Sequence, residues 1–336
     1  MQKRVALWDN LKLFLIFLVV IGHLTIQYFS SSQMFCAMTL AIYTFHMPAF
    51  IFVSGLFAKK AINSSTPPYK RVFGFLMIYL GLRVVNYASN IVFGVKCSFD
   101  IFSVKDIPWY MLSMAIWYMI TYVLKSISPK YIFTTSVIFA CFAGYMTGDA
   151  DFLCILRVVT FYPFFYAGYV LDRGKIEEVT AKKGARIFSG IAFSTFVVIC
   201  ATLTDKMKWL FPLLSGRRKY GALGDFQPWG CLMRLAYFAI ALMLVFAVIS
   251  LCPRQETPFS RQGRNTLQIY FWHRPILYIM KNAGLFYLIK QIGAGWEWVA
   301  LIVIIALTAV LNLSFLGKPL ELLMNPKEKK EYAITE

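Results

Sequence analysis

Long apolar runs are the feature that most constrains how this chain of 336 residues can fold. A helix needs about 20 mostly apolar residues to cross a bilayer, and its backbone polar groups must be hydrogen bonded within the protein. We therefore predict an all-α, polytopic transmembrane helical bundle of about ten spans, at residues 11–29, 34–57, 72–95, 109–124, 131–147, 152–170, 187–204, 231–251, 267–281 and 298–316.

The composition agrees with a membrane protein. Hydrophobic residues make up 59% of the chain and charged residues only 15%, whereas a soluble domain is about half apolar and about a quarter charged. Aromatic residues, at 17%, suit belts of Trp and Tyr at the two membrane interfaces. With no internal repeat and no separate soluble segment, residues 1–336 are predicted to be one membrane-embedded domain.

The net charge of +18 indicates topology rather than nucleic-acid binding. Most Lys and Arg residues fall in short loops, where they orient spans and meet anionic headgroups, and no RNA- or DNA-binding motif is present. With the N-terminus inside, twenty Lys and Arg residues lie in cytoplasmic segments and nine in outer ones. By the positive-inside rule, this distribution predicts that both termini are cytoplasmic. The outer cluster Arg217, Arg218 and Lys219 is an exception to the rule.

The cysteines and the N-terminus exclude other classes. None of the seven cysteines has CxxC spacing and most lie in apolar runs, so they are interpreted as small hydrophobes, with neither a disulfide framework nor a metal site. The apolar run after Lys3 and Arg4 is too long for a signal peptide and lacks a small-residue cleavage site. It is predicted to be a retained first span.

Polar residues lie inside the first span, where a purely structural helix would not have them. Lys12 and His23 are eleven residues apart, which at about 100° per residue places both on one face, about 16 Å apart along the axis. Such a stripe must face a cavity or other helices. Asp9 and Lys12 lie at the cytoplasmic end, where Lys12 could snorkel to the surface. His23 lies deep within the predicted span, which favours a functional role.

The other two histidines are also predicted to be intramembrane. His46 lies in the second, antiparallel span at a depth similar to that of His23, and Pro48 frees a backbone carbonyl and bends the helix just beyond it. His273 lies in the ninth span. Imidazole is the usual proton-transfer group near neutral pH, so the three histidines together favour chemistry.

Two arginines inside spans leave two interpretations open. Arg83, followed by Asn86, and Arg157 each require an anion or a carbonyl partner, and carboxylates are almost absent from the spans. Either an anionic ligand or backbone carbonyls would satisfy them. The loop after the second span carries basic residues that could bind phosphates or fix the topology, namely Lys59, Lys60, Lys70 and Arg71.

Several short motifs along the chain, taken in this order, resemble those of a known protein family. They are Lys12 and His23 in the first span, Phe45-His46-Met47-Pro48 and Phe52-Val53-Ser54-Gly55 in the second, Trp109-Tyr110, Pro163-Phe164-Phe165 with Gly168, and Tyr270, His273 and Pro275. Over about residues 4–320 the chain resembles the acyltransferase-3 family of membrane-bound O-acyltransferases, and most closely its fucose 4-O-acetylase-like branch. The Ser54-Gly55 pair would also allow close helix approach.

The resemblance implies an enzyme of the bacterial cytoplasmic (inner) membrane that transfers an acyl group, usually acetyl from acetyl-CoA, to a carbohydrate hydroxyl without a metal. It implies His23 as general base, with His46 or His273 orienting it or stabilising the oxyanion. The residues expected to hold the donor's phosphates are Lys12, Lys70, Arg71 and Arg83, and those expected to contact substrate are Asp9, Trp109 and Arg157.

Two departures from the family and two competing functions remain. Many members carry R-x-x-R after the second helix, where this chain has only Lys70-Arg71, and Lys12 stands where arginine is common. A transporter or exporter of a glycan or a small organic anion would also suit histidine and arginine in a membrane cavity, but transporters typically show internal repeats. A non-catalytic scaffold leaves the histidines unexplained. The acceptor glycan and the oligomeric state stay open.

Overall fold

A computed structural model describes residues 6–96, 99–258 and 260–320, apart from the side chains of residues 261 and 264. Within these ranges the chain is helical and has no strand, only an isolated antiparallel bridge between Ser103 and Phe152. The α-helices are α1 (Ala6–Thr25), α2 (Gln33–Ile62), α3 (Tyr69–Val92), α4 (Trp109–Leu124), α5 (Pro129–Phe142), α6 (Ile155–Val170), α7 (Arg173–Ala181), α8 (Lys183–Thr202), α9 (Thr204–Met207), α10 (Phe211–Leu214), α11 (Gly230–Leu251), α12 (Thr266–Asn282), α13 (Leu285–Lys290) and α14 (Trp296–Leu311). The 3₁₀ helices are η1 (Ile26–Tyr28), η2 (Ala143–Tyr145), η3 (Lys208–Leu210), η4 (Tyr220–Trp229), η5 (Ser260–Arg264) and η6 (Ser314–Gly317).

Each of the ten predicted spans falls on one of these helices, so the all-α membrane bundle is confirmed. In the described ranges, five helices are long and apolar enough to cross a membrane, or six if α14 and the segment after it form one span bent by 68°. Helices α4 and α6 are apolar but have only 16 residues each. The number of ten crossings and the orientation of the termini therefore stay predictions.

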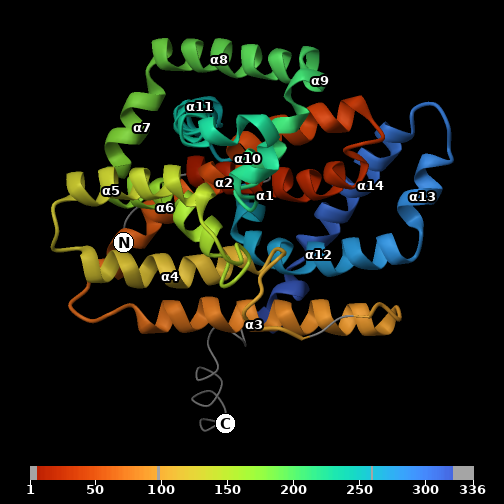
Figure 1. Ribbon diagram of the computed structural model, residues 1–336, viewed down its shortest axis with the longest axis horizontal. Coiled ribbons are helices and arrows are strands. Elements are labelled where there is room, and N and C mark those ends of the chain that lie inside the picture. Colours follow the sequence, from red (N-terminus) through yellow and green to blue (C-terminus); the bar gives the residue numbers. More distant parts are fainter. Residues whose placement is uncertain (1–5, 97–98, 259, 321–336) are drawn as a thin grey trace, which may run out of the picture.

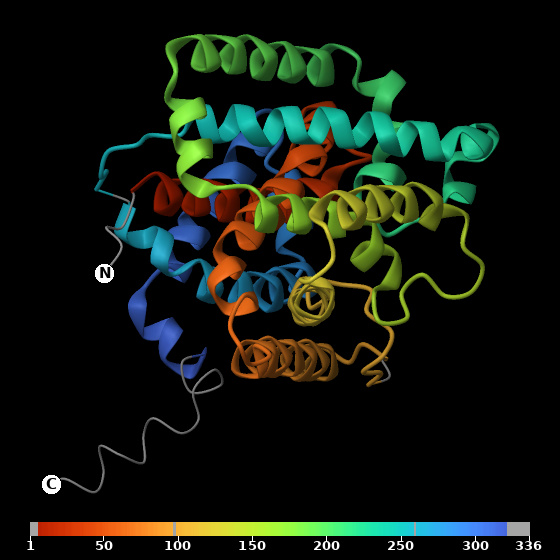
Figure 2. The same cartoon turned by 90° about the vertical axis from the view of Figure 1, so that its left-hand side faces the viewer.

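The helices are stacked in layers, with α1 and α2 at the centre of the bundle (Figure 1). Helix α11 covers α2 on one side, and α8 lies outside α11 (Figure 2). On the other side α4 separates the centre from α3, which forms the opposite edge. The first two spans, which carry His23 and His46, thus pack against other helices on both of these sides.

Helices α2 and α6 make the most intimate contact in the bundle. A Cβ atom at Gly55 would lie 2.0 Å from the carbonyl oxygen of Phe165, and one at Gly168 would lie 2.0 Å from that of Phe52. Only glycine allows backbones to approach this closely. The close approach predicted at Ser54-Gly55 is confirmed.

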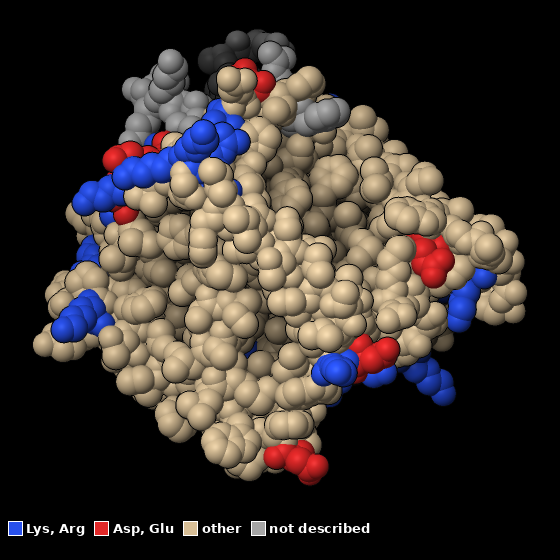
Figure 3. Space-filling view, turned by 90° about the horizontal axis from the view of Figure 1, so that it is seen from above, with Lys and Arg blue, Asp and Glu red and all other residues tan. Residues whose placement is uncertain are grey.

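The face of the molecule that carries α8 has an apolar middle (Figure 3). Figure 3 looks onto the side that carries α8, and its broad centre is almost free of Lys, Arg, Asp and Glu, which gather near the margins. Lys182 and Lys183 lie at the start of α8, and Lys206 and Lys208 follow its end. This distribution suits a band of lipid between two charged interfaces.

Two predicted loops contain more structure than expected. Residues 171–186 hold α7 and the start of α8, and residues 205–230 hold α10, η3 and η4. Helix α7 begins where the Asp172 carboxylate accepts a hydrogen bond of 2.9 Å from the Lys175 amide, which is an N-cap. These helices are too short to show as apolar runs.

Candidate active site

A polar cavity of about 720 Å³ lies at the end of the bundle where α1 finishes. Helix α1 contributes His23, α2 contributes Tyr43 and His46, and the start of α4 contributes Trp109. The remaining polar lining comes from η1, α6, α12 and the loops around residues 105 and 217, as Gln27, Arg157, Arg274, Tyr278, Lys105, Asp106, Ser215, Arg217 and Arg218. We call this space the histidine cavity.

The three histidines meet at the histidine cavity. His23 and His46 line it, and His273 lies behind His23, fully buried, with ring centroids 5.4 Å apart. Nδ1 of His46 is 2.7 Å from the Ile42 carbonyl oxygen, and Nδ1 of His273 is 3.0 Å from that of Ile269.

These carbonyl contacts determine which ring nitrogen carries the proton. A carbonyl oxygen only accepts, so Nδ1 of His46 and of His273 must donate, and in the neutral rings Nε2 keeps a lone pair. Nε2 of His273 has no hydrogen-bond partner among the described residues. The site therefore holds two oriented imidazoles that can accept a proton.

The position of His23 follows from where α1 ends. The helix ends at Thr25, two residues after His23, so His23 lies close to its C-terminal end. Gly22 beside it lets α2 approach, since a Cβ there would be 3.2 Å from Ile42 and 3.3 Å from Tyr43. Helix α2 continues through Pro48 without interruption, and His46 faces the same cavity.

Asp106, in the loop before α4, is the carboxylate that faces the histidines. It pairs with Arg274, whose Nη2 is 2.9 Å away, and accepts a hydrogen bond of 2.6 Å from the Tyr278 hydroxyl. Burial by itself raises the pKa of the Asp106 carboxyl, but Arg274 and Tyr278 more than offset this and hold the pKa well below its usual range. Asp106 is therefore ionised and neutralises Arg274.

Arg157 fits both interpretations left open by the sequence, because it has a backbone carbonyl partner and also a donor that a ligand could use. Its Nη2 donates to the Lys105 carbonyl oxygen at 3.2 Å, whereas its buried Nη1 has no partner among the described residues. The guanidinium lies 5.1 Å from the centre of the Trp109 ring, a cation–π distance. One donor of Arg157 is thus used by the backbone, and another is available to a ligand.

The basic cluster in the 205–230 segment ties two loops together. Arg217 holds Asp151 with two hydrogen bonds, of 2.8 and 2.7 Å, and Lys219 donates to the Gly148 carbonyl oxygen. Burial raises the pKa of Asp151, but the bond and the charge of Arg217 outweigh it and lower the pKa. These contacts give Arg217 and Lys219 a structural role.

The predicted site residues separate into two groups. The first group lines or contacts the histidine cavity, namely His23, His46, His273, Trp109 and Arg157. The second lies toward the other end of the bundle, where Lys12 pairs with Asp9 at 2.9 Å and Lys70 and Arg71 begin α3. Arg83 belongs to neither group, since it lines a smaller pocket further along α3.

Sequence reasoning missed Asp106, Tyr278 and the role of Arg217. Asp106 and Arg217 lie in predicted loops, and nothing in the local sequence shows that these loops fold back over the histidines. The sequence offered one signal, the basic cluster Arg217, Arg218 and Lys219 in a segment predicted to lie outside, where the positive-inside rule expects few Lys and Arg residues.

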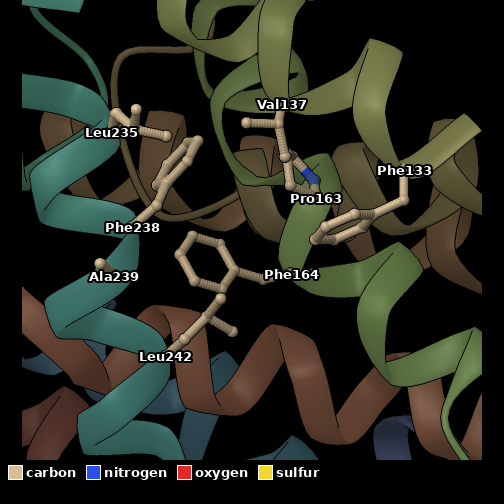
Figure 4. A pocket seen from close by; sticks show the side chains of 8 residues that line it. All are labelled: Phe133, Val137, Pro163, Phe164, Leu235, Phe238, Ala239 and Leu242. Atoms are coloured by element: carbon tan, nitrogen blue, oxygen red, sulfur yellow. The ribbon is translucent and has the colours of Figure 1, made fainter. Parts of the chain in front are cut away.

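The apolar pocket between α5, α6 and α11 offers no chemistry that competes with the histidine cavity. The pocket in Figure 4, between α5, α6 and α11, has a volume of about 260 Å³ and an entirely apolar lining. No group of three or more His, Cys, Asp or Glu side chains within the described ranges could hold a metal ion. The histidine cavity is thus the candidate for an active site.

Comparison with known proteins identifies the family of the chain. The model of the acyltransferase-3 family, described as an acyltransferase domain, matches residues 5–313. Neither a curated protein nor a solved structure matches the sequence. The family match extends from the first residues of α1 to just beyond α14 and so includes all three histidines. The chain therefore belongs to the acyltransferase-3 family and is a membrane acyltransferase.

Proposed function

We propose that this acyltransferase moves an acyl group, expected to be acetyl, from acyl-CoA to a hydroxyl of a cell-envelope carbohydrate, with His23 as the general base. The observation that carries the proposal is the convergence of His23, His46 and His273 on one polar cavity. In this proposal the N-terminus is cytoplasmic and the protein lies in a bacterial inner membrane.

The reaction needs a base because a sugar hydroxyl is a poor nucleophile. As the hydroxyl oxygen attacks the thioester carbon, His23 takes its proton and a C–O bond forms. The resulting tetrahedral oxyanion collapses, the C–S bond breaks, and the CoA thiolate takes the proton back from the imidazolium. The products are the carbohydrate ester and CoA.

The other cavity residues fit distinct parts of this reaction. His273 touches the His23 ring without lining the cavity, so we assign it the role of positioning residue. His46, when neutral, offers only a lone pair at Nε2, which suits a hydrogen bond from an acceptor hydroxyl. Stabilisation of the oxyanion needs a donor, and the unpartnered Nη1 of Arg157 is one.

The opposite end of the bundle suits the donor's phosphates. Lys12, Lys70 and Arg71 lie there, and Lys12 is about 16 Å from His23 along the axis of α1. Acyl-CoA is an extended molecule whose phosphates and thioester lie at opposite ends of a flexible arm. A separation of this kind supports binding of the nucleotide at one end and reaction at the other. The prediction that Arg83 also contacts the donor stays a prediction.

The test is acetyl transfer by purified protein in detergent, using radiolabelled acetyl-CoA and surface glycan from the source cells. Wild-type protein should label the glycan, and His23→Gln should lower kcat by about 10²–10⁴-fold because the general base is lost. Full transfer by His23→Gln would show that His23 is not the base. Acetate flux into vesicles without label on the glycan would favour the transporter instead.

A matched control distinguishes loss of the base from unfolding of the protein. Phe14 lies on the same helix and is 40% exposed, so Phe14→Ala should keep wild-type transfer. Both variants should elute as a single monodisperse species and melt near the wild-type temperature.

A further inference from the structure

A second polar pocket lies beside the histidine cavity. It has a volume of about 230 Å³ and is lined by Arg83, Asn86, Tyr87 and Asn90 of α3 and by Phe99 and Asp100 of the following loop. Lining by amide, guanidinium, carboxylate and phenol groups contrasts with the apolar pocket of Figure 4. We call this space the side pocket.

Two buried polar atoms of the side pocket's lining residues lack a partner. Nε of Arg83 and Oδ1 of Asn86 make no hydrogen bond among the described residues. Leaving a buried donor or acceptor unpaired costs about 1–3 kcal/mol. A ligand hydroxyl group could accept a hydrogen bond from Nε of Arg83 and donate one to Oδ1 of Asn86, because the two residues lie three positions apart on α3.

The side pocket and the histidine cavity share a wall. Lys105, Asp106 and Tyr278 line both. Asp106 and Tyr278 are bonded to each other and to Arg274, so the wall is polar throughout. A ligand with a hydroxyl near His23 could therefore extend past this wall into the side pocket.

The side pocket carries charges of both signs, which suits a neutral polar ligand better than a phosphate. Arg83 and Lys105 are positive and Asp100 is negative, while Asp106 on the shared wall is paired with Arg274. Tyr87 and Phe99 pack edge to face with centroids 5.2 Å apart and add an apolar surface. Drug-sized ligands occupy about 300–1,000 Å³, so 230 Å³ suits a single polyhydroxylated ring.

We propose that the side pocket binds the sugar unit next to the one that is acylated, so that the acceptor is a carbohydrate of at least two units. This inference rests on the proposed function and names its acceptor more closely. Arg83 and Asn86 would hydrogen bond the second sugar, while the first presents its hydroxyl to His23.

The test compares carbohydrate fragments of different length. The probes are fragments of the source cells' surface polysaccharide, released by mild acid and sorted into one-unit and two-unit pools. Calorimetric titration of the purified full chain should show two-unit fragments binding about tenfold more tightly than one-unit fragments. Arg83→Met and Asn86→Leu should each remove most of this difference and leave one-unit binding within about twofold of wild type.

Ser89→Ala is the matched control on the same helix. The Ser89 hydroxyl bonds back to the Val85 carbonyl oxygen at 2.8 Å and lines neither space, so this variant should keep the preference for two units. Loss of the preference in both Arg83→Met and Asn86→Leu, with Ser89→Ala unchanged, supports the two-residue assignment, and retention of the preference by either variant would overturn it.

Three results would overturn the proposal. These are equal binding of both pools by wild type, equal weakening of both pools in the variants, and an Arg83→Met effect confined to KM for acetyl-CoA, which would assign Arg83 to the donor. The proposed function fails separately, if fragments bind with the expected length preference but receive no label from acetyl-CoA.

Discussion

Helices α2 and α6 pack backbone against backbone at one end of the bundle and line a cavity at the other. At Gly55 and Gly168 the two backbones are in direct contact. Nine residues before Gly55, and eleven before Gly168, the same helices present His46 and Arg157 to a cavity of about 720 Å³. One end is therefore held by close packing, and the other is hollow and polar.

The difference shows how the bundle supports a cavity in a membrane. The packed end relies on glycine, because any side chain would separate the backbones. At the hollow end charge pairs fix the loops, of which Asp106 with Arg274 and Asp151 with Arg217 are examples. Rigid packing at one end should hold the histidines in place, while charge pairs hold the loops at the other.

The largest expected effect comes from breaking the packed end. Gly55→Leu forces the α2 and α6 backbones apart and should destabilise the protein by at least about 3 kcal/mol, the upper end of ordinary overpacking. We expect loss of the monodisperse species in size-exclusion chromatography. Gly184 of α8 has nothing within 4 Å of an added Cβ, so Gly184→Leu should remain folded. A normally melting Gly55→Leu protein would contradict the role of this contact.

The next effect concerns chemistry at the hollow end. His273→Gln removes the ring that contacts His23 and should lower kcat by about 100-fold, while KM for acetyl-CoA stays within about twofold because no donor contact is lost. Steady-state kinetics with labelled acetyl-CoA measures both constants. A rise in donor KM with unchanged kcat would place the donor, and not the proton transfer, beside His273.

A smaller effect is expected at the packed end, where a substitution should change KM for acetyl-CoA and not kcat. Lys12→Met should raise KM for acetyl-CoA about tenfold, as expected for the loss of one charged contact, and leave kcat unchanged. The Lys12 ammonium pairs with Asp9, so Asp9→Asn, which preserves the cation, should not raise donor KM. If Lys12→Met lowered kcat instead, the two ends would not divide binding from chemistry as we propose.

The smallest expected effect is the pH-dependent stability that the contact between Asp151 and Arg217 provides. Asp151 has a lowered pKa in the folded protein, so its pairing with Arg217 adds stability above the unfolded carboxyl pKa of about 3.9, and this stability is lost as pH falls. Asp151→Asn should cost about 1 kcal/mol between pH 5 and 8, and the difference from wild type should shrink below about pH 4. Thermal melts across this range measure it.

The exposed pair of Asp205 and Lys208 provides the control for this measurement. Its two side chains are far more exposed than those of Asp151 and Arg217, so Asp205→Asn should leave the melting temperature unchanged at every pH. A deficit for Asp151→Asn that grew in acid would mean that the carboxylate does not stabilise the fold.

Local sequence was enough to locate helices but not all of their ends. Residue 11 is a reasonable start for an apolar span, yet α1 begins at Ala6. Asn10 explains the difference, because its side chain donates to the carbonyl oxygens of Pro253 and Gln255 at 2.9 and 3.0 Å. Partners more than 240 residues away satisfy a polar residue that hydropathy alone would exclude from the helix.

The sequence by itself determined the fold class and the residues with which chemistry is possible. Apolar runs of sufficient length must become helices in lipid, and three histidines within them can be recognised without coordinates. Only the tertiary structure decided that His23, His46 and Arg157 share a cavity while Lys12 and Arg71 do not. Helical periodicity specifies a face of each helix, but the loops that carry Asp106 and Arg217 reach the cavity through contacts distant in sequence.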